Sequence, residues 1–184
     1  MTSRPSKAAV ATVSFWRAAG PDRWYARSDA FDALVRRRLG PLQRAAAAGA
    51  LDAWAETPLG ALALLILLDQ APRNLFRGSP QAFATDRAAQ EFATAAVARG
   101  FDRRTPWPLR QFFYLPFEHA EDRALQRRAI ALFRAFGDAE SLRWAIVHDE
   151  IIERFGRFPH RNVILGRRSS TAELDYLENG GFQG

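Results

Sequence analysis

The sequence predicts an all-α fold, a single domain of antiparallel helical hairpins with about eight helices. Apolar residues recur at helical spacing, and no long segment alternates apolar and polar residues as a half-buried strand would. Capping residues precede many of the helical stretches, and glycines follow them. The length of 184 residues suits one domain.

The expected elements follow in order along the chain. Residues 1–7 are expected to form a disordered tail, and residues 8–184 to form the helical domain. Helices are expected at 8–18, 28–48, 57–70, 79–99, 107–113, 121–136, 138–155 and 171–178. Short loops between such helices favour antiparallel neighbours.

Start and stop signals support these boundaries. Three hydroxyl–proline pairs predict helix starts, namely Thr57-Pro58, Ser79-Pro80 and Thr105-Pro106. The hydroxyl caps the helix, and proline lacks the N–H that would have no partner in the first turn. Ser170 and Glu173 have the spacing of a capping box, and Asp138 is a weaker start signal. Glycine accepts the left-handed conformation at a helix end, which predicts ends at Gly49, Gly100, Gly137 and Gly156.

The charge and composition exclude several classes of site. The chain has 26 basic and 20 acidic residues and a formal net charge of +6. The basic residues are Lys7 and 25 arginines, among which one triplet and three pairs are scattered along the chain. Nucleic-acid-binding proteins usually gather basic residues on one face, so nucleic acid is not an expected partner. Since there is no cysteine, a disulfide framework, thiolate metal ligands and thiol catalysis are excluded.

The apolar segments do not predict a membrane protein. The longest run, Leu59–Leu68, is far shorter than the ~20 residues that a membrane-spanning helix needs, so it predicts a buried helix. Ala8–Phe15 is also apolar, but Trp16-Arg17 stands where a signal peptide would have small residues for cleavage. We therefore expect a cytoplasmic protein without a membrane partner.

Three segments break the amphipathic pattern with unusual polar residues. They are 68–74, 114–122 and 148–162, and all three histidines of the chain lie in the last two. The first and third segments end alike, with an apolar helix, a proline and an Arg-Asn pair. The pair is Arg73-Asn74, directly after Pro72, in one segment and Arg161-Asn162, after Pro159-His160, in the other.

These segments resemble the signature of an uncharacterised, mainly bacterial family, domain-of-unknown-function 924. Its members carry LDQ-PRN-FRG, YLPF-HSED and FGRFPHRN-LGR-ST motifs, and the matching segments here are Leu68–Gly78, Tyr114–Asp122 and Phe155–Thr171. An early Phe15-Trp16 and the following Trp24-Tyr25 also fit. The resemblance covers nearly the whole chain after the first dozen residues.

The resemblance implies a fold similar to tetratricopeptide-type helical arrays and a set of candidate residues. It implies no mechanism, because the family has no assigned activity. One departure is Ala120, where the family usually has serine, so any role of that hydroxyl is absent here.

The two segment ends that carry a proline and an Arg-Asn pair leave two interpretations open. A proline that ends a helix leaves carbonyl groups without partners, and the arginine and asparagine side chains could satisfy these carbonyls and lock two helix ends together. Alternatively, the arginines line a cleft that selects a carboxylate, a phosphate or an acidic peptide. This cleft would gather Arg73, Arg157 and Arg161 with Gln70, His119 and His160. The candidate ligand-binding residues are Asp69, Gln70, Arg73, Asn74, Tyr114, Arg157, Arg161 and Asn162.

The histidines also allow two interpretations. His148 shares a helix face with Trp144 and Ile151, so it is a hydrogen-bonded core residue or a ligand and proton shuttle. His119 follows Glu118, and a carboxylate–histidine pair would raise the imidazole pKa and suit acid–base work. The candidate catalytic residues are Glu118, His119, His148 and His160.

The remaining acidic residues and motifs point to no other chemistry. Glu121 and Asp122 are expected to serve the start of the helix at 121–136. No histidine has the spacing that places two metal ligands on one helix face, so we expect no metal, and no cofactor motif is present. The sequence also lacks a glycine-flanked serine elbow and a glycine-rich phosphate loop.

Three functions remain, and they can be told apart. The first hypothesis is a binding module whose cleft takes an acidic peptide or a small anionic ligand. The alternative is an enzyme, such as a hydrolase, that acts on a small anionic substrate with Glu118, His119 and an arginine clamp. RNA binding is third and is favoured only by the charge. Motifs that converge on one deep pocket would favour the enzyme, and mutually bonded motifs with an open groove elsewhere would favour the binding module. The sequence predicts no oligomeric state.

Overall fold

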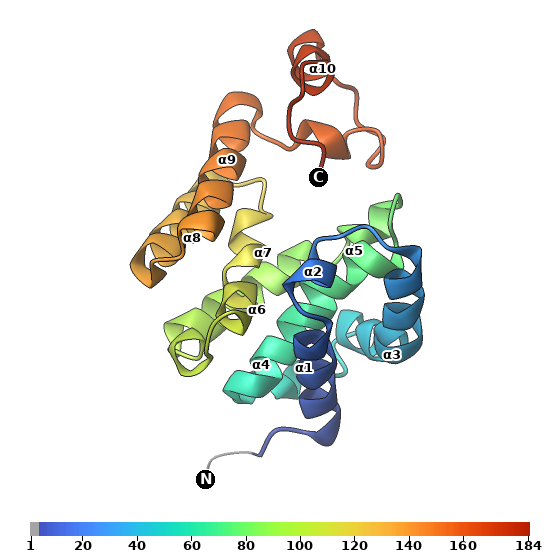
Figure 1. Ribbon diagram of the computed structural model, residues 1–184, viewed down its shortest axis with the longest axis vertical. Helices are drawn as coiled ribbons and strands as arrows, with labels where there is room; N and C mark the ends of the chain where they lie inside the picture. The colour runs from blue at the N-terminus through green and yellow to red at the C-terminus, as the bar shows by residue number, and fades with distance from the viewer. Residues whose placement is uncertain (1–3) are drawn as a thin grey trace. The chain divides into compact units, whose positions relative to one another are not determined.

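The structure, a computed structural model, describes residues 4–184 (Figure 1). The prediction of an all-α protein is confirmed, because the described residues form helices, turns and loops but no strand. Each helix in this part of the chain is too short or too polar to cross a lipid bilayer. The tetratricopeptide-like and antiparallel details of the fold stay predictions.

The chain folds as two compact units. Unit 1 comprises the chain up to Arg77 together with Gln81–Pro116, and unit 2 comprises Gly78–Pro80 together with Phe117–Gly184. The single domain expected from the sequence stays a prediction.

Unit 1 is built around a helix that is buried on every side. The α-helices of this unit are α1 (Lys7–Ala19), α2 (Pro21–Trp24), α3 (Asp29–Ala47), α4 (Pro58–Leu65), α5 (Ala71–Leu75) and α6 (Asp86–Ala98). A π-turn, Ile66–Gln70, joins α4 to α5. Helices α1 and α6 pack on α4, and α3 packs on α5 and the π-turn (Figure 1). The apolar run predicted to be a buried helix therefore forms the centre of unit 1.

Shorter elements lie between these helices and after α6. They are the 3₁₀ helices Asp52–Glu56, Pro80–Ala82, Asp102–Arg104 and Leu109–Phe113, and the single-turn helix α7 (Leu115–Glu118). Aromatic rings join the last 3₁₀ helix of unit 1 to its first helices. Phe112 lies edge-on to both Trp16 and Trp24, with ring centroids 6.0 and 4.9 Å apart.

Unit 2 is a helix pair followed by a short helical appendage. Helix α8 (Arg123–Phe136) packs beside α9 (Ala139–Phe155), as Figure 1 shows. The 3₁₀ helix Pro159–Arg161 and α10 (Thr171–Glu178) follow. Ile151, Ile152 and Phe158 form the buried core of this region, and Val147, Phe155, Tyr176 and Phe182 pack around them.

Several predicted helix boundaries are confirmed by their caps. The Thr57 hydroxyl accepts from the Gly60 N–H at the start of α4. Asp138 caps α9, and Ser170 and Glu173 form the complete capping box of α10. Gly137 and Gly156 end α8 and α9 in the left-handed conformation, with φ of 88° and 70°.

Other predicted boundaries are wrong. The helix expected at 57–70 continues through Pro72 to Leu75, because the π-turn admits a proline in the first turn of α5. The helix expected at 79–99 is α-helical only from Asp86, after the 3₁₀ turn Pro80–Ala82. The segment expected at 107–113 is the 3₁₀ helix Leu109–Phe113, and α2 and α7 were not predicted.

The predicted tail falls partly outside the described residues. Residues 1–3 lie outside them, whereas Ser6 and Lys7 belong to the start of α1. The Ser6 hydroxyl caps this helix by accepting from the Ala9 N–H at 3.0 Å. Helix α1 therefore begins within the segment that was expected to be a disordered tail.

Candidate functional site

The first motif lies at the π-turn of unit 1. The turn inserts one extra residue into the helix, and the Ala71 N–H bonds to the Ile66 carbonyl. Asp69 and Gln70 lie in the turn with exposed fractions of only 1% and 6%, and Gln70 Nε2 donates to Asp69 Oδ2 at 2.5 Å. Single π-turns are often found at functional sites, which keeps these two residues as candidates.

Pro72 frees a backbone carbonyl, as the sequence led us to expect, but a different side chain satisfies it. Proline has no N–H to offer the carbonyl of Leu68, four residues earlier. The Thr85 hydroxyl donates to that oxygen at 2.5 Å. The partner is therefore a threonine from the start of the next helix, and not the arginine or asparagine of the motif.

Arg73 and Asn74 are held by carboxylates within unit 1. Arg73 Nη2 donates to both oxygens of Asp86, at 2.8 and 2.9 Å, and its other Nη donates to the Ala82 carbonyl. Asn74 Nδ2 donates to Asp32 Oδ1 at 2.8 Å. The two side chains therefore tie α5 to two other segments of unit 1.

Asp32 is the centre of a second ion pair. Arg77 donates to both of its oxygens, from Nε at 2.8 Å and from Nη2 at 3.0 Å. Burial raises the pKa of Asp32, but the hydrogen bonds from Arg77 and Asn74 outweigh burial and hold the pKa below its usual value. The carboxylate is therefore ionised at neutral pH and already occupied by two donors.

Tyr114, the candidate from the second motif that lies in unit 1, is buried against Asp102. Its hydroxyl donates to Asp102 Oδ2 at 2.8 Å. Burial and this hydrogen bond raise the pKa of Tyr114 far above its ordinary value. The phenol therefore acts as a fixed donor at neutral pH.

In unit 2, the structure pairs Glu118 with His148. Glu118 Oε1 lies 3.2 Å from His148 Nδ1, and the Trp144 carbonyl lies 2.8 Å from the same nitrogen. Burial lowers the pKa of His148 to about 4, so the ring is neutral at pH 7. Both neighbours of Nδ1 accept hydrogen bonds, so Nδ1 carries the hydrogen and Nε2 keeps its lone pair.

All three histidines of the chain lie in this unit, and two of them, His148 and His160, pack against phenylalanine rings. The ring of His148 lies 6.5 Å from that of His119 and 4.7 Å from that of Phe182. His160 lies 5.2 Å from Phe182 and 5.6 Å from Phe158. Among the described residues, no group of three or more histidine, aspartate and glutamate side chains could hold a metal ion.

Arg161 and Asn162 are buried and bonded within unit 2. Arg161 Nη1 donates to the His119 carbonyl at 3.1 Å, and its guanidinium lies 4.4 Å from the centre of the Phe158 ring. Asn162 Nδ2 donates to the Ser169 hydroxyl, and Arg167 Nε donates to Asn162 Oδ1 at 2.9 Å. The third motif thus includes a buried hydrogen-bond network.

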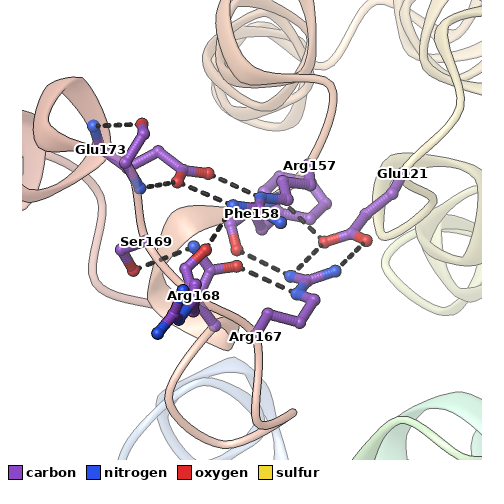
Figure 2. Close-up of polar contacts among 9 residues, drawn as sticks. Glu121, Arg157, Phe158, Arg167, Arg168, Ser169 and Glu173 are labelled. Atoms are coloured by element: carbon purple, nitrogen blue, oxygen red, sulfur yellow. Dashed lines mark hydrogen bonds and ion pairs between the residues drawn. The ribbon is translucent and has the colours of Figure 1, made fainter.

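Two bidentate ion pairs extend this network (Figure 2). Arg167 donates two hydrogen bonds to the Glu121 carboxylate, at 2.6 and 2.9 Å. Arg157 donates two to the Glu173 carboxylate, at 2.7 and 2.9 Å. The hydrogen bond from Arg157 lowers the pKa of Glu173 to about 2. Glu121 thus holds the loop after α9, while Asp122 alone caps α8 by accepting from the Leu125 N–H.

Two open hollows adjoin on the surface of unit 2. The polar hollow, of about 540 Å³, is lined by Arg154, Phe155, Arg157, Ser170, Ala172 and Glu173. The aromatic hollow, of about 570 Å³, is lined by Trp144, Val147, Arg154, Asp175, Tyr176, Asn179, Gly180, Gly181 and Phe182. Arg154 lines both of them, and neither is lined by a candidate catalytic residue.

Comparisons with known proteins agree with the motifs. A family model described as "Bacterial protein of unknown function (DUF924)" matches residues 12–181. The chain belongs to the DUF924 family. A solved structure of a protein of unknown function from Agrobacterium tumefaciens is similar to it, with 48% sequence identity and a TM-score of 0.90. The match covers 94% of this chain and 97% of that one. No curated protein matches the chain.

The candidate residues of this DUF924 protein divide between the two units. Asp69, Gln70, Arg73, Asn74 and Tyr114 belong to unit 1, and the other candidates belong to unit 2. The expected cluster of Gln70, His119 and Arg161 therefore stays a prediction, as do the catalytic and ligand-binding roles of all these residues.

Sequence reasoning did not select the residues that line the hollows outside the DUF924 motifs. Trp144, Val147 and Arg154 lie at helical spacing along α9, so a stripe that ends in an arginine was visible. The missing signal was α10, because nothing in the sequence indicated that Tyr176 and Phe182 would pack beside that stripe.

Proposed function

We propose that this DUF924 protein is a binding module that takes an anionic group of its partner, a carboxylate or a phosphate, in the polar hollow of unit 2. The state of Arg154 supports this proposal. Its guanidinium lies 4.7 Å from the centre of the Phe155 ring and 5.6 Å from that of Tyr176. The side chain is exposed, and no carboxylate among the described residues forms an ion pair with it.

Two neighbouring arginines of unit 2 already form ion pairs with carboxylates of the chain. Arg157 is bound to Glu173 and Arg167 to Glu121, so an incoming anion would have to displace a carboxylate from either. The amide groups of Ser170 and Glu173 at the start of α10 are also used, by the capping box. Of the two arginines that line the polar hollow, Arg154 is the one that can accept an anion without breaking an ion pair. Stacked guanidinium groups bind carboxylates and phosphates well.

The state of the motif side chains favours binding over catalysis. They are buried or half-buried and bonded within their own units, while the hollows lie open on the surface, which favours a binding module. Such an arrangement holds a surface rigid and leaves its open face to a partner.

An acid–base enzyme is the second candidate, and one observation favours it. Glu118 and a neutral His148 form a buried pair among the three histidines. Chromogenic phosphate and carboxylate esters would test it, with His148→Gln as the comparison. Turnover by the native chain that His148→Gln abolishes would favour the enzyme, and equal background rates would favour the binding module.

The experiment for the proposed function is a titration with acetate and with inorganic phosphate. The arginine Nε–H signals are followed by ¹⁵N NMR, and we expect the signal of Arg154 to shift with saturation. Arg154→Gln should abolish the saturable shifts in the polar hollow. Arg127→Gln, which changes an exposed arginine on α8, is the matched control and should leave them unchanged. Saturation that survives in Arg154→Gln would overturn the proposal.

A further inference from the structure

We propose that the partner of this site is an extended protein segment that places one acidic side chain at Arg154 and a neighbouring apolar side chain in the aromatic hollow. This inference rests on the proposed function and names the class of its partner. It is carried by the continuity of the two hollows, the composition of their walls and the local balance of charge.

The aromatic hollow offers an apolar surface that the fold leaves partly uncovered, with the Arg143 guanidinium 4.7 Å from the centre of the Trp144 ring. Trp144 is 38% exposed, and its ring lies 6.1 Å from that of Phe182. The Phe182 N–H donates to the Tyr176 hydroxyl at 2.9 Å, and both rings pack on the core of unit 2. The walls are therefore held in place before binding. A preformed aromatic surface of this kind contributes most to the free energy of binding when it buries an apolar side chain of the partner.

The shape of the site fits a chain segment better than a small molecule. Both hollows are open, and they meet at Arg154. Small-molecule sites usually enclose most of their ligand, which an open surface does not do. An extended peptide passes through both hollows and places successive side chains in them, so it uses the whole surface.

The charges around the hollows select a single acidic group. Unit 2 contains ten arginines and eleven acidic residues, so the basic excess of the chain lies in unit 1. Glu173 in the polar hollow is paired with Arg157, whereas Asp175, which lines the aromatic hollow, forms no ion pair within the described residues. Asp175 therefore repels a polyanion, whereas one acidic side chain at Arg154 is attracted over a short range. Arginine and aromatic rings also suit single-stranded RNA, but the negative charge of unit 2 disfavours a phosphate backbone.

The experiment uses the full chain and three short glycine–serine peptides that differ only at their centre. The centres are Glu-Leu, Glu-Ser and Gln-Leu, and a short oligouridylate is the nucleic-acid probe. Binding is followed by NMR at the Trp144 indole and the Arg154 Nε–H. We expect the Glu-Leu peptide to bind about tenfold more tightly than either of the other peptides, because it buries a leucine and pairs a charge.

Variants separate the two halves of the site. Trp144→Ala should remove the advantage of Glu-Leu over Glu-Ser and leave the affinity for Glu-Ser and for acetate unchanged. Ile146→Ala is the control, because Ile146 is 36% exposed on the same helix and lines neither hollow. Val147→Thr, a polar substitution of similar size in the aromatic hollow, gives the same measurement if Trp144→Ala fails to fold.

The outcomes distinguish this inference from the proposed function. Equal affinities for Glu-Leu and Glu-Ser would overturn the inference while acetate binding at Arg154 still stands. If neither acetate nor any peptide shifts the Arg154 signal, both fail. Tighter binding of oligouridylate than of Glu-Leu would overturn the inference in favour of nucleic acid. Self-association that Trp144→Ala abolishes would overturn it in favour of a second copy of the chain.

Discussion

The segments Pro-Arg-Asn of unit 1 and Pro-His-Arg-Asn of unit 2 have similar sequences and different structures. In unit 1, Pro72 lies in the first turn of α5 and follows a π-turn without a break in the helix. In unit 2, α9 has already ended at Gly156 when Pro159 begins a 3₁₀ helix. Proline therefore ends neither helix, because the first continues through Pro72 and the second ends at Gly156, as its glycine predicted.

The side chains after each proline also differ in their partners. Arg73 and Asn74 bind the carboxylates of Asp86 and Asp32, so this segment of unit 1 is held by charge. In unit 2, Arg161 donates to a backbone carbonyl and Asn162 to the Ser169 hydroxyl. The motif secures the fold in both units, and the open site of unit 2 lies beside it at Arg154.

The largest expected effect is on the carboxylate network of unit 1. Asp32→Ala leaves Asn74 and Arg77 without their acceptor, and we expect the free energy of unfolding to fall by about 2–4 kcal/mol. Asp29→Ala, an exposed change on the same helix, should cost less than about 1 kcal/mol. Urea denaturation measures both. Equal losses would show that the network does not hold unit 1 together.

Removal of the Thr85 hydroxyl, which replaces the N–H that Pro72 lacks, should have a smaller effect on stability. Thr85→Val removes the hydrogen bond to the Leu68 carbonyl in a buried site, and we expect a loss of about 1–2 kcal/mol. Thr94→Val is the matched control, because that hydroxyl donates to the Gln90 carbonyl on an exposed helix face. The difference between the two denaturation midpoints is the measurement. Identical midpoints would contradict a role for Thr85 in closing the π-turn.

The ion pair between Glu173 and Arg157 should affect how the stability of the protein depends on pH. Its pKa is about 2 in the folded protein, against an ordinary value of 4.5. The pair therefore stabilises the fold above about pH 4.5, and this contribution is lost as the pH falls toward 2. Melting temperatures should fall in that range for the native chain and more gently for Glu173→Gln. Parallel curves for the two proteins would argue against the pair.

The smallest expected effect concerns His148, whose pKa burial lowers to about 4. In the unfolded chain this histidine binds a proton near its ordinary value of 6.5, so the fold loses stability as the pH falls from 6.5 to 4. NMR titration should find one imidazole that titrates near 4, and His148→Gln identifies it. Phe182→Ala uncovers the ring and should raise its pKa. Three imidazoles that all titrate near 6.5 would contradict the burial of this residue.

The sequence was sufficient for features that local residues decide. Thr57, Asp138 and Ser170 cap their helices as predicted, because a side chain and a nearby backbone N–H are enough to form a cap. The helix of residues 138–155 was predicted with its end at Gly156, because glycine readily adopts the left-handed conformation that ends a helix.

Features that depend on distant segments were missed. The helix through Pro72 needs the hydroxyl of Thr85 to satisfy a freed carbonyl, and no local signal connects these residues. The sequence placed His119 next to Glu118, but tertiary packing brings His148 to that carboxylate. The hollows likewise exist only because α10 packs near α9, which no spacing within either helix reveals.

The most direct test measures binding and stability together in two arginine variants. Arg154→Gln should lose acetate and Glu-Leu peptide binding and keep the unfolding free energy of the native chain. Arg73→Gln should keep that binding and lose about 1–3 kcal/mol of stability, because it breaks the pair with Asp86. If Arg73→Gln abolishes binding in a folded protein while Arg154→Gln binds normally, the site lies at the motif arginine and not in the hollows of unit 2.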